Sequence, residues 1–391
     1  MGDLPLGGDP LRPLVVLGAT GSIGRQTIDV ADRIGAPIHA IAARRASDDL
    51  LALGRRLPDA LVFVVDPGDR RDAFTAEFGD RLHLGPGSIT SVAATPGVTV
   101  VNGIVGSAGL AASLSTLYAG NRLALANKES LVAGGPLIDA ALATEGAELI
   151  PIDSEHSAIW QCLSGEDPAS VRRIVLTASG GPFRGATMDD LRNVTPEQAL
   201  DHPTWSMGAR ISIDSATLMN KAFEVIEAHH LFGLSYDQID VVVHPQSIVH
   251  SFVEFVDGVV KAEVGRPDMR KPIQYAITTP MRIAVDREPM DLIGTDLTFE
   301  AVDHSVFRCL DLGYAAGRTG GTAPAVLNAA DEVAVQAFLD GAIPFTAIAD
   351  VVEATLDRHE PHVPESIDDI HAVDEEARAH AAEACASYRA G

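Results

Sequence analysis

Short apolar runs alternate with amphipathic stretches from residue 14 to about residue 150. Buried parallel strands read as continuous apolar runs, while the helices that cover them have one apolar face. The alternation therefore predicts an α/β domain over residues 1–150, in which helices cover a parallel sheet. The expected strands are Leu14–Leu17, Ile38–Ala42, Leu61–Val65, Val98–Val101, Leu123–Ala126 and Glu148–Ile152.

Beyond residue 150 the pattern changes, and an α+β domain is expected over residues 151–285. Its last two strands are joined by a turn at Asp257 and Gly258. Residues 286–305 carry scattered prolines and acids, which indicates a connector. The expected strands are Ile174–Ala178, Ile239–His244, 247–255 and 259–264.

From residue 306 to residue 391 the chain is rich in alanine, and its apolar positions have helical spacing. This predicts a small C-terminal helical domain. Residues 340–391 contain no chemical motif, so packing or subunit contact is the role expected for them. The expected helices are 307–317, 323–339, 344–358 and 366–388.

The charge of the chain argues against two classes of partner. The 391 residues include 29 Lys and Arg against 54 Asp and Glu, a net charge of −25 that repels nucleic acid and anionic membranes. No window approaches 18 uninterrupted apolar residues, so no membrane span is predicted.

Two further features predict a cytoplasmic protein. The first twelve residues contain glycine, proline and aspartate where a signal peptide needs a basic start and an apolar stretch. The three cysteines are widely spaced and form no CxxC pair, which suits a reducing compartment.

A glycine-rich turn, GATGSIG at residues 18–24, directly follows the first expected strand and precedes a helical stretch. Glycines there let the backbone approach a pyrophosphate, and the helix N-terminus supplies N–H donors. The position favours a Rossmann-type dinucleotide site, although a tight turn that needs no ligand is the alternative.

The end of the second strand distinguishes the two nicotinamide cofactors. An acid there would bind the ribose 2′-hydroxyl, whereas a cation would accept the 2′-phosphate. The chain has Arg44 and Arg45 at this point, so NADPH is predicted in preference to NADH. A solvated arginine pair is the alternative.

Three acids are candidate ligands for a divalent metal. Asp153 and Glu155 follow an expected strand, and in extended backbone they would share a face. Glu224 lies in the stretch 215–232, which predicts one helix. Such oxygen ligands suit Mg²⁺ or Mn²⁺. Solvated loop acids are the alternative for the DxE pair.

Polar residues around the same helix form a candidate phosphate site. Ser215 is placed to cap the helix, and Asn220 and Glu224 share one face of it. With Lys221, and with Ser179 in a glycine-rich turn, they offer hydroxyl, amide and ammonium donors for a phosphate. Ordinary caps and turns would explain each of them singly.

Two other segments carry candidate chemistry. Lys128 follows an expected strand at the ligand-facing edge of the sheet, where it would reach substrate and nicotinamide unless Lys128 and Glu129 are merely solvated. The stretch HPTWSMG at residues 202–208 predicts a loop that closes over a small substrate. A buried Trp205 anchor is the alternative.

These motifs occur together and in one order. The chain resembles the 1-deoxy-D-xylulose 5-phosphate reductoisomerase family from about residue 14 to residue 340. The stretches that carry the resemblance are GATGSIG, ALANKESLV, PIDSEHSAIWQ, TASGGPFR, HPTWSMGARISIDSATLMNKAFEVIEA, HPQSIVHS and GRPDMRKPI.

The resemblance implies a homodimer whose subunits have an NADPH domain, a catalytic domain with a closing loop near residues 201–210, and a C-terminal helical domain. Asp153, Glu155 and Glu224 would hold Mn²⁺, Mg²⁺ or Co²⁺. Ser154 and Lys128 would contact the hydroxyketone part of the substrate, with Lys128 and the three acids as the catalytic set. The residues implied for the substrate phosphate are Ser179, Ser215, Asn220 and Lys221.

Further roles follow from the same resemblance. The residues of the closing loop would be His202, Trp205 and Met207. The residues that would face NADPH are Thr20, Gly21, Ser22, Ile23, Asn127, Glu129 and Gly208, in addition to Arg44 and Arg45. The chain has Ala46 where the family commonly has asparagine, so one expected contact near the 2′-phosphate is missing.

The implied reaction rearranges and reduces 1-deoxy-D-xylulose 5-phosphate to 2-C-methyl-D-erythritol 4-phosphate in the non-mevalonate isoprenoid pathway. Two alternatives remain open at this point. Another NADPH oxidoreductase, such as a semialdehyde dehydrogenase, would need a catalytic thiol, for which Cys162 is the candidate. A non-catalytic dinucleotide-binding module would need neither the acids nor the closing loop.

Overall fold

The computed structural model describes residues 11–205, 207–284 and 290–389. Two compact units account for them: unit 1 holds residues 11–127, 140–157 and 268–284, and unit 2 holds the others. The expected absence of a signal peptide falls mostly on residues 1–10, outside the described residues. Part of the closing loop (residue 206) and of the connector (residues 286–289) lies outside them as well.

Unit 1 is built on a seven-stranded parallel sheet with the strand order β4-β3-β2-β1-β5-β6-β7. The predicted α/β fold class is confirmed, and the six predicted strands are present. The seventh, β4, was not predicted, because three residues at a partly exposed sheet edge make no recognisable apolar run. The strands are β1 Leu14–Leu17, β2 Ile38–Arg45, β3 Leu61–Asp66, β4 Leu82–Leu84, β5 Thr99–Asn102, β6 Arg122–Leu125 and β7 Glu148–Pro151.

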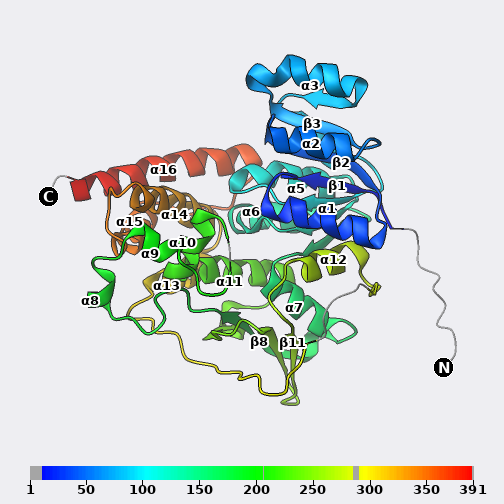
Figure 1. Cartoon of the computed structure of the whole chain (residues 1–391). Helices are drawn as coiled ribbons and strands as arrows, with labels where there is room; N and C mark the ends of the chain where they lie inside the picture. The colour runs from blue at the N-terminus through cyan, green and yellow to red at the C-terminus, as the bar shows by residue number, and fades with distance from the viewer. Residues whose placement is uncertain (1–10, 206, 285–289, 390–391) are drawn as a thin grey trace. The chain divides into compact units, whose positions relative to one another are not determined.

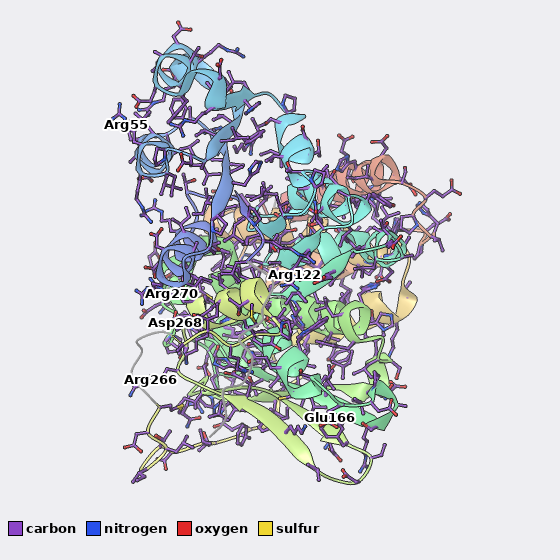
Figure 2. The ribbon with its side chains drawn as sticks, turned by 90° about the vertical axis from the view of Figure 1, so that its right-hand side faces the viewer. Arg55, Arg122, Glu166, Arg266, Asp268 and Arg270 are labelled. Carbon is purple, nitrogen blue, oxygen red and sulfur yellow. The ribbon has the colours of Figure 1, made fainter. Side chains whose placement is uncertain are left out.

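Helices accompany this sheet, and one of them comes from a distant part of the chain. Helix α12 packs against α1 within unit 1, where Arg270 pairs with Asp29 of α1 and lies beside Asp268 (Figure 2). Arg122 of β6 also donates to the carbonyl oxygen of Thr279, at 3.0 Å. The helices are α1 Ser22–Ile34, α2 Asp48–Arg56, α3 Arg71–Phe78, α4 Ser88–Ala93, α5 Leu110–Tyr118 and α12 Arg270–Thr278.

Unit 2 contains a four-stranded mixed sheet with the order β11-β10-β8-β9. Strand β8 runs parallel to β9 and antiparallel to β10, and β10 and β11 form a hairpin. The hairpin turns at Gly258, which has a φ of 86°. All four predicted strands are present, as β8 Val171–Ala178, β9 Ile239–Val243, β10 Val249–Phe255 and β11 Val260–Val264.

The helices of unit 2 include the four that the C-terminal pattern predicted (Figure 1). Helices α6 Lys128–Ala141 and α7 Ser154–Leu163 have residues in both units. The other α-helices of the unit are α8 Met188–Leu191, α9 Pro196–Leu200, α10 Ala209–Thr217, α11 Met219–Phe232, α13 Arg308–Thr319, α14 Ala323–Leu339, α15 Ala347–Leu356 and α16 Ile367–Arg389.

Helix α11 lies in the core of unit 2 and is buried for most of its length. Its Phe223 and Ile226 pack in one apolar cluster with Ile174 of the sheet and with Leu327 and Phe338 of α14. A helix enclosed in this way has little freedom to move, so polar residues on it have fixed positions.

The prediction of one helix over residues 215–232, capped by Ser215, is wrong. Leu218 has a left-handed φ of 61°, and its N–H bonds to the carbonyl oxygen of Ser215, which closes α10. Ser215 therefore belongs to the last turn of α10, and α11 begins at Met219 without a side-chain cap. Among the described residues, no helix is long and apolar enough to cross a membrane.

Helix α13 lies close to α11 at Gly313, and a substitution there tests how tightly the two helices pack. A Cβ at Gly313 would lie 2.3 Å from the Cβ of Ala222 on α11. Gly313→Ala should therefore destabilise the protein by about 1–3 kcal/mol in urea unfolding, although helix propensity alone favours alanine by about 1 kcal/mol. Ala315→Gly, at an exposed position of the same helix, measures propensity alone. A Gly313→Ala protein more stable than the parent would contradict this packing.

Candidate functional site

The glycine turn of unit 1 leaves room for a ligand at its middle glycine. A Cβ at Gly24 would lie 2.4 Å from the carbonyl oxygen of Gly18, so the third glycine is needed for close packing between the turn and the helix. At Gly21 the only neighbour within 4 Å would be that same oxygen, at 3.2 Å. The backbone at Gly21 is therefore open to approach, as pyrophosphate binding requires.

The N-terminus of α1 is suited to an anion. Gly21 is its N-cap, and within the described part of the chain no side chain caps it and no acid occupies its first turn. The Ser22 Oγ accepts from the Nε2 of Gln26, which lies one turn further along α1, at 3.1 Å. The first-turn N–H groups and the helix dipole therefore favour a phosphate beside Thr20, Gly21, Ser22 and Ile23.

The other predicted cofactor residues of unit 1 lie at the same edge of the sheet. Arg44 and Arg45 are exposed at the carboxyl end of β2, and Asn127 follows β6. Asn127 donates through Nδ2 to the carbonyl oxygens of Ile104 and Gly106, at 2.6 and 2.9 Å. The carboxyl ends of parallel strands form the ligand-binding edge of such sheets, so these residues fit a bound dinucleotide.

In unit 2 the buried carboxylate of Glu224 is hydrogen-bonded to three of the predicted substrate-binding residues. Its Oε1 accepts from Asn220 Nδ2 at 2.5 Å and from Lys128 Nζ at 3.2 Å, and its Oε2 accepts from Lys221 Nζ. Glu224 is 1% exposed, and Lys128 and Lys221 are 8% and 3% exposed. Asn220 and Glu224 share a helix face as predicted, and the ammonium groups compensate the buried charge.

Lys128 reaches this cluster from the first residue of α6. Its Nζ also donates to Asn220 Oδ1, at 2.6 Å. The alternative of a solvated Lys128–Glu129 pair is wrong, because both side chains make buried or partly buried ion pairs within unit 2.

The DxE acids have a different local structure from the predicted one. The backbone from Ser154 onward is helical rather than extended. Asp153 directly precedes the helix and bonds to its first turn. Its carbonyl oxygen accepts from the Ser157 N–H at 2.8 Å, and its Oδ1 accepts from the Glu155 N–H at 3.3 Å. Ser154 Oγ donates to Glu155 Oε2 at 2.5 Å. Two carboxylates on one helical turn are hard oxygen donors, which fits Mg²⁺ or Mn²⁺.

Ser179 and His202 form a second polar pair in unit 2. His202 Nδ1 accepts from the backbone N–H groups of Thr204 and Trp205, at 3.1 and 2.9 Å. Because Nδ1 accepts, the proton of the neutral ring is on Nε2, which donates to Ser179 Oγ at 2.9 Å. Ser179 Oγ also accepts from the Gly181 N–H at 3.3 Å, so its own hydroxyl proton remains available for an acceptor.

The turn after Ser179 packs on the end of α10. A Cβ at Gly181 would lie 2.7 Å from the carbonyl oxygen of Ser215, which brings the two predicted phosphate-binding serines into neighbouring segments. Trp205 and Met207 are half-buried and Gly208 is the N-cap of α10, but their closing role stays a prediction.

The thiol that a semialdehyde dehydrogenase would need is not activated. Cys162 is buried, and burial raises the pKa of its thiol to about 11. A catalytic cysteine needs a lowered pKa so that the thiolate is present. The alternative that depends on Cys162 is therefore contradicted.

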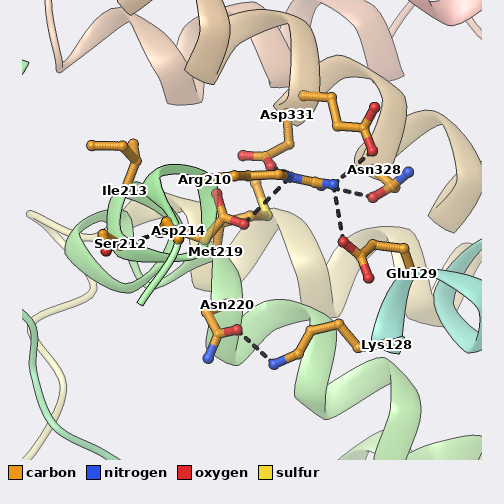
Figure 3. A network of polar contacts seen from close by, with 12 residues as sticks. Lys128, Glu129, Arg210, Ser212, Ile213, Asp214, Met219, Asn220, Asn328 and Asp331 are labelled. Carbon is orange, nitrogen blue, oxygen red and sulfur yellow. Dashed lines mark hydrogen bonds and ion pairs between the residues drawn. The ribbon is translucent and has the colours of Figure 1, made fainter. Parts of the chain in front are cut away.

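One partly buried arginine, Arg210, carried no recognisable motif in the sequence. Arg210 of α10 is surrounded by Glu129 of α6, by Asp214, and by three polar residues of α14 (Figure 3). Apart from Asp214, which is four residues away on the same helix, its partners come from segments about 80 and 120 residues away, so local spacing did not indicate the cluster. Its position two residues after the HPTWSMG stretch was one available hint.

A dinucleotide turn on a parallel sheet, together with carboxylates and ammonium groups, defines a nicotinamide-dependent oxidoreductase. Family models agree on which one. The model described as 1-deoxy-D-xylulose 5-phosphate reductoisomerase matches residues 14–135, and the models for its C-terminal domains match residues 149–232 and 264–380.

Curated relatives extend the match to nearly the whole chain. The 1-deoxy-D-xylulose 5-phosphate reductoisomerase of Xanthomonas axonopodis pv. citri (strain 306) is 48% identical over 382 residues, which cover 95% of this chain and 96% of that protein. The enzyme of Geobacillus kaustophilus (strain HTA426) is 47% identical over 381 residues, covering 95% and 98%. The chain belongs to the 1-deoxy-D-xylulose 5-phosphate reductoisomerase family.

Solved structures of this family have the same fold. The Zymomonas mobilis enzyme in complex with NADPH is 41% identical with a TM-score of 0.90, covering 96% of this chain and 100% of that one. A DOX-P reductoisomerase in complex with NADPH, fosmidomycin and magnesium is 38% identical with a TM-score of 0.91, covering 97% and 100%. The predicted fold class, enzyme class and cofactors are thereby confirmed.

The histidine geometry predicts two opposite titrations. Burial lowers the pKa of His202, whereas the hydrogen bond to Asp369 raises the pKa of the exposed His362. NMR titration of the ring protons should give a midpoint below about 6.5 for His202 and above it for His362, with assignments from His202→Gln and His362→Gln. Folding stability from His202 is present above the unfolded pKa and is lost as the pH falls. A His202 midpoint above that of His362 would contradict the assigned tautomer.

Proposed function

We propose that this chain converts 1-deoxy-D-xylulose 5-phosphate into 2-C-methyl-D-erythritol 4-phosphate, as the family to which it belongs does. The observation that carries the proposal is the buried Glu224 carboxylate, which is held by Asn220 and by the ammonium groups of Lys128 and Lys221. These are four of the residues that the family's motifs assign to the metal and the substrate.

The metal is proposed to bind to Asp153, Glu155 and Glu224. All three supply carboxylate oxygens, and the DxE pair lies on one turn of unit 1 while Glu224 is the buried acid of unit 2. When bound, the divalent ion supplies Lewis acidity at the hydroxyketone and NADPH supplies the hydride. A family member holds magnesium together with fosmidomycin, which supports a chelating ligand at this site.

The protein's own residues bind and orient the substrate. Lys128 and Ser154 are proposed to contact the hydroxyketone oxygens, where the Lys128 ammonium stabilises developing negative charge. The phosphate is proposed to bind to Ser179, Ser215, Asn220 and Lys221. The Ser179 hydroxyl suits this role, because it accepts from His202 and Gly181 and keeps its own proton to donate. Binding a group remote from the reacting carbons provides energy for positioning them.

The segment from His202 to Gly208 is proposed to close over the substrate and exclude water. The imidazole of His202 links the phosphate-binding Ser179 to the backbone at Thr204 and Trp205, so phosphate binding and loop position share one hydrogen-bonded chain. Trp205 and Met207 would then cover the substrate, and Gly208, Asn127 and Glu129 would face NADPH.

We also propose a cytoplasmic homodimer. The cysteines Cys162, Cys309 and Cys385 are buried thiols, which suits a reducing compartment. Strand β11 is an edge strand whose Val260 and Val264 are exposed, a surface that another subunit would cover. Sedimentation equilibrium measures the assembly directly, and a single monomeric species at micromolar concentration would rule the dimer out.

Glu224→Gln tests the metal assignment. The amide loses the negative charge while the helix surface keeps its shape, so kcat with 1-deoxy-D-xylulose 5-phosphate and Mn²⁺ should fall by about 10²-fold or more. The Kd for Mn²⁺ should rise, while the Kd for NADPH, followed by its fluorescence, should change little. Glu353→Gln, at a surface ion pair with Arg308, is the control. Activity that survives both chelation and Glu224→Gln would show that the metal is held elsewhere.

Arg44→Asp tests the choice of cofactor. Replacing the cation by an acid removes a partner of the 2′-phosphate, so the ratio of kcat/KM for NADPH to that for NADH should fall roughly tenfold or more. Arg56→Asp, on α2 of the same unit, changes the charge equally and is the control. If both variants shift the ratio alike, general charge rather than a specific contact accounts for the preference.

A further inference from the structure

Arg210 has no role in the proposed function, yet five polar side chains surround its partly buried guanidinium. Nη1 donates to Glu332 Oε1 at 2.6 Å and to Glu129 Oε1 at 3.2 Å. Nη2 donates to Asn328 Oδ1 at 2.8 Å and to Asp331 Oδ2 at 3.3 Å. A fifth partner, Asp214 Oδ2, lies 3.5 Å from Nε.

We propose that Arg210 is a positioning residue, which fixes the first turn of α6, and through it the ammonium of Lys128, against α10 and α14. The proposal rests on the proposed function, because it takes Lys128 to contact the substrate. Arg210 itself contacts Glu129, the residue next to Lys128, so its effect on the reaction passes through another residue.

These contacts help to fix the position of the first turn of α6. Gly134 has non-helical dihedrals (φ −117°, ψ 19°), so a kink separates residues 128–133 from the rest of α6. Within unit 2, Lys128 bonds to Asn220 and Glu224 of α11, and Glu129 bonds to Arg210 of α10. Two adjacent side chains thus connect the turn to two different helices, in addition to the apolar packing of the residues that follow them.

The electrostatics of the cluster require a cation at this position. Asp331 is fully buried, and burial raises its pKa to about 6. Burial and the charge of Asp331 likewise raise the pKa of Asp214. Four carboxylates lie around this one guanidinium, so those that are ionised would repel one another if the guanidinium were removed.

A lysine would not make the same set of contacts. The planar guanidinium has five N–H donors in a fixed fork and bonds to Glu129 of α6 and to Asn328 and Glu332 of α14. Its face also lies over the ring of Phe223, with the central carbon 5.7 Å from the ring centroid. An ammonium would keep the charge and lose the bridge between α6 and α14.

Arg210 also fixes the end of the closing loop. It lies two residues after Gly208, the N-cap of α10. Its bonds to Asn328, Asp331 and Glu332 hold the start of α10 on α14, so the described loop residues 202–205 and 207–208 end at an immobile point. The same guanidinium therefore serves the loop and the Lys128 turn.

A double-mutant cycle in kcat tests whether Arg210 acts through Lys128. Arg210→Met, Lys128→Met and the double variant are assayed with NADPH, Mn²⁺ and 1-deoxy-D-xylulose 5-phosphate, at a temperature where urea unfolding shows each of them folded. Arg210→Met should lower kcat by about tenfold in the parent, since small misplacements of a catalytic group are costly. In the Lys128→Met background it should lower kcat by less than about twofold.

Two further variants decide between positioning and mere stability. Arg210→Lys keeps a buried charge and should still lose most of the kcat that Arg210→Met loses. Arg308→Met removes an arginine with two carboxylate partners on α15 and should leave kcat unchanged. Equal losses from Arg210→Met in both backgrounds, or full activity in Arg210→Lys, would overturn the proposal. A fully active Lys128→Met would instead refute the proposed role of Lys128.

Discussion

The compensation of buried charge is the constraint on which the site in unit 2 depends. A carboxylate that is 1% exposed, such as Glu224, is stable only if opposite charges and hydrogen bonds replace the water it has lost. Lys128 and Lys221 supply those charges, and Asn220 supplies the amide donor. The chain has four lysines, and two of them are bonded to this one carboxylate.

Charge compensation occurs a second time at Glu129, one residue further along α6. Glu129 is compensated by Arg210, as Glu224 is by Lys128, and the two pairs involve adjacent residues of one helical turn. The helices that provide the partners, α10 and α11, are separated by the single left-handed residue Leu218. The break allows the two helices to point in different directions, so that each can present a charged partner to the same turn. One continuous helix from Ala209 to Phe232 would not do so.

Elements with regular apolar spacing were predictable, while features that depend on long-range contacts were not. The ten predicted strands follow from short apolar runs between turn residues, and the four C-terminal helices and the shared face of Asn220 and Glu224 follow from the helical period of 3.6 residues. The short strand β4, the break at Leu218 and the helical start at Ser154 do not, because tertiary packing overrides local preference there. The Arg210 cluster could not be predicted from the sequence for a related reason, because its members lie on three separate helices and form no sequence motif.

The C-terminal helices have no chemical motif, but consecutive ion pairs connect α16 to Arg210. Arg378 of α16 pairs with one oxygen of Glu332 on α14, and Arg210 takes the other oxygen. One carboxylate shared by two guanidinium groups has its orientation set from both sides, which makes it a better-defined partner than a singly paired surface acid. Helix α16 therefore does more than bury apolar area, because its Arg378 also helps to orient Glu332, a partner of Arg210. With the positioning role proposed for Arg210, helices that carry none of the proposed site residues contribute to the position of Lys128.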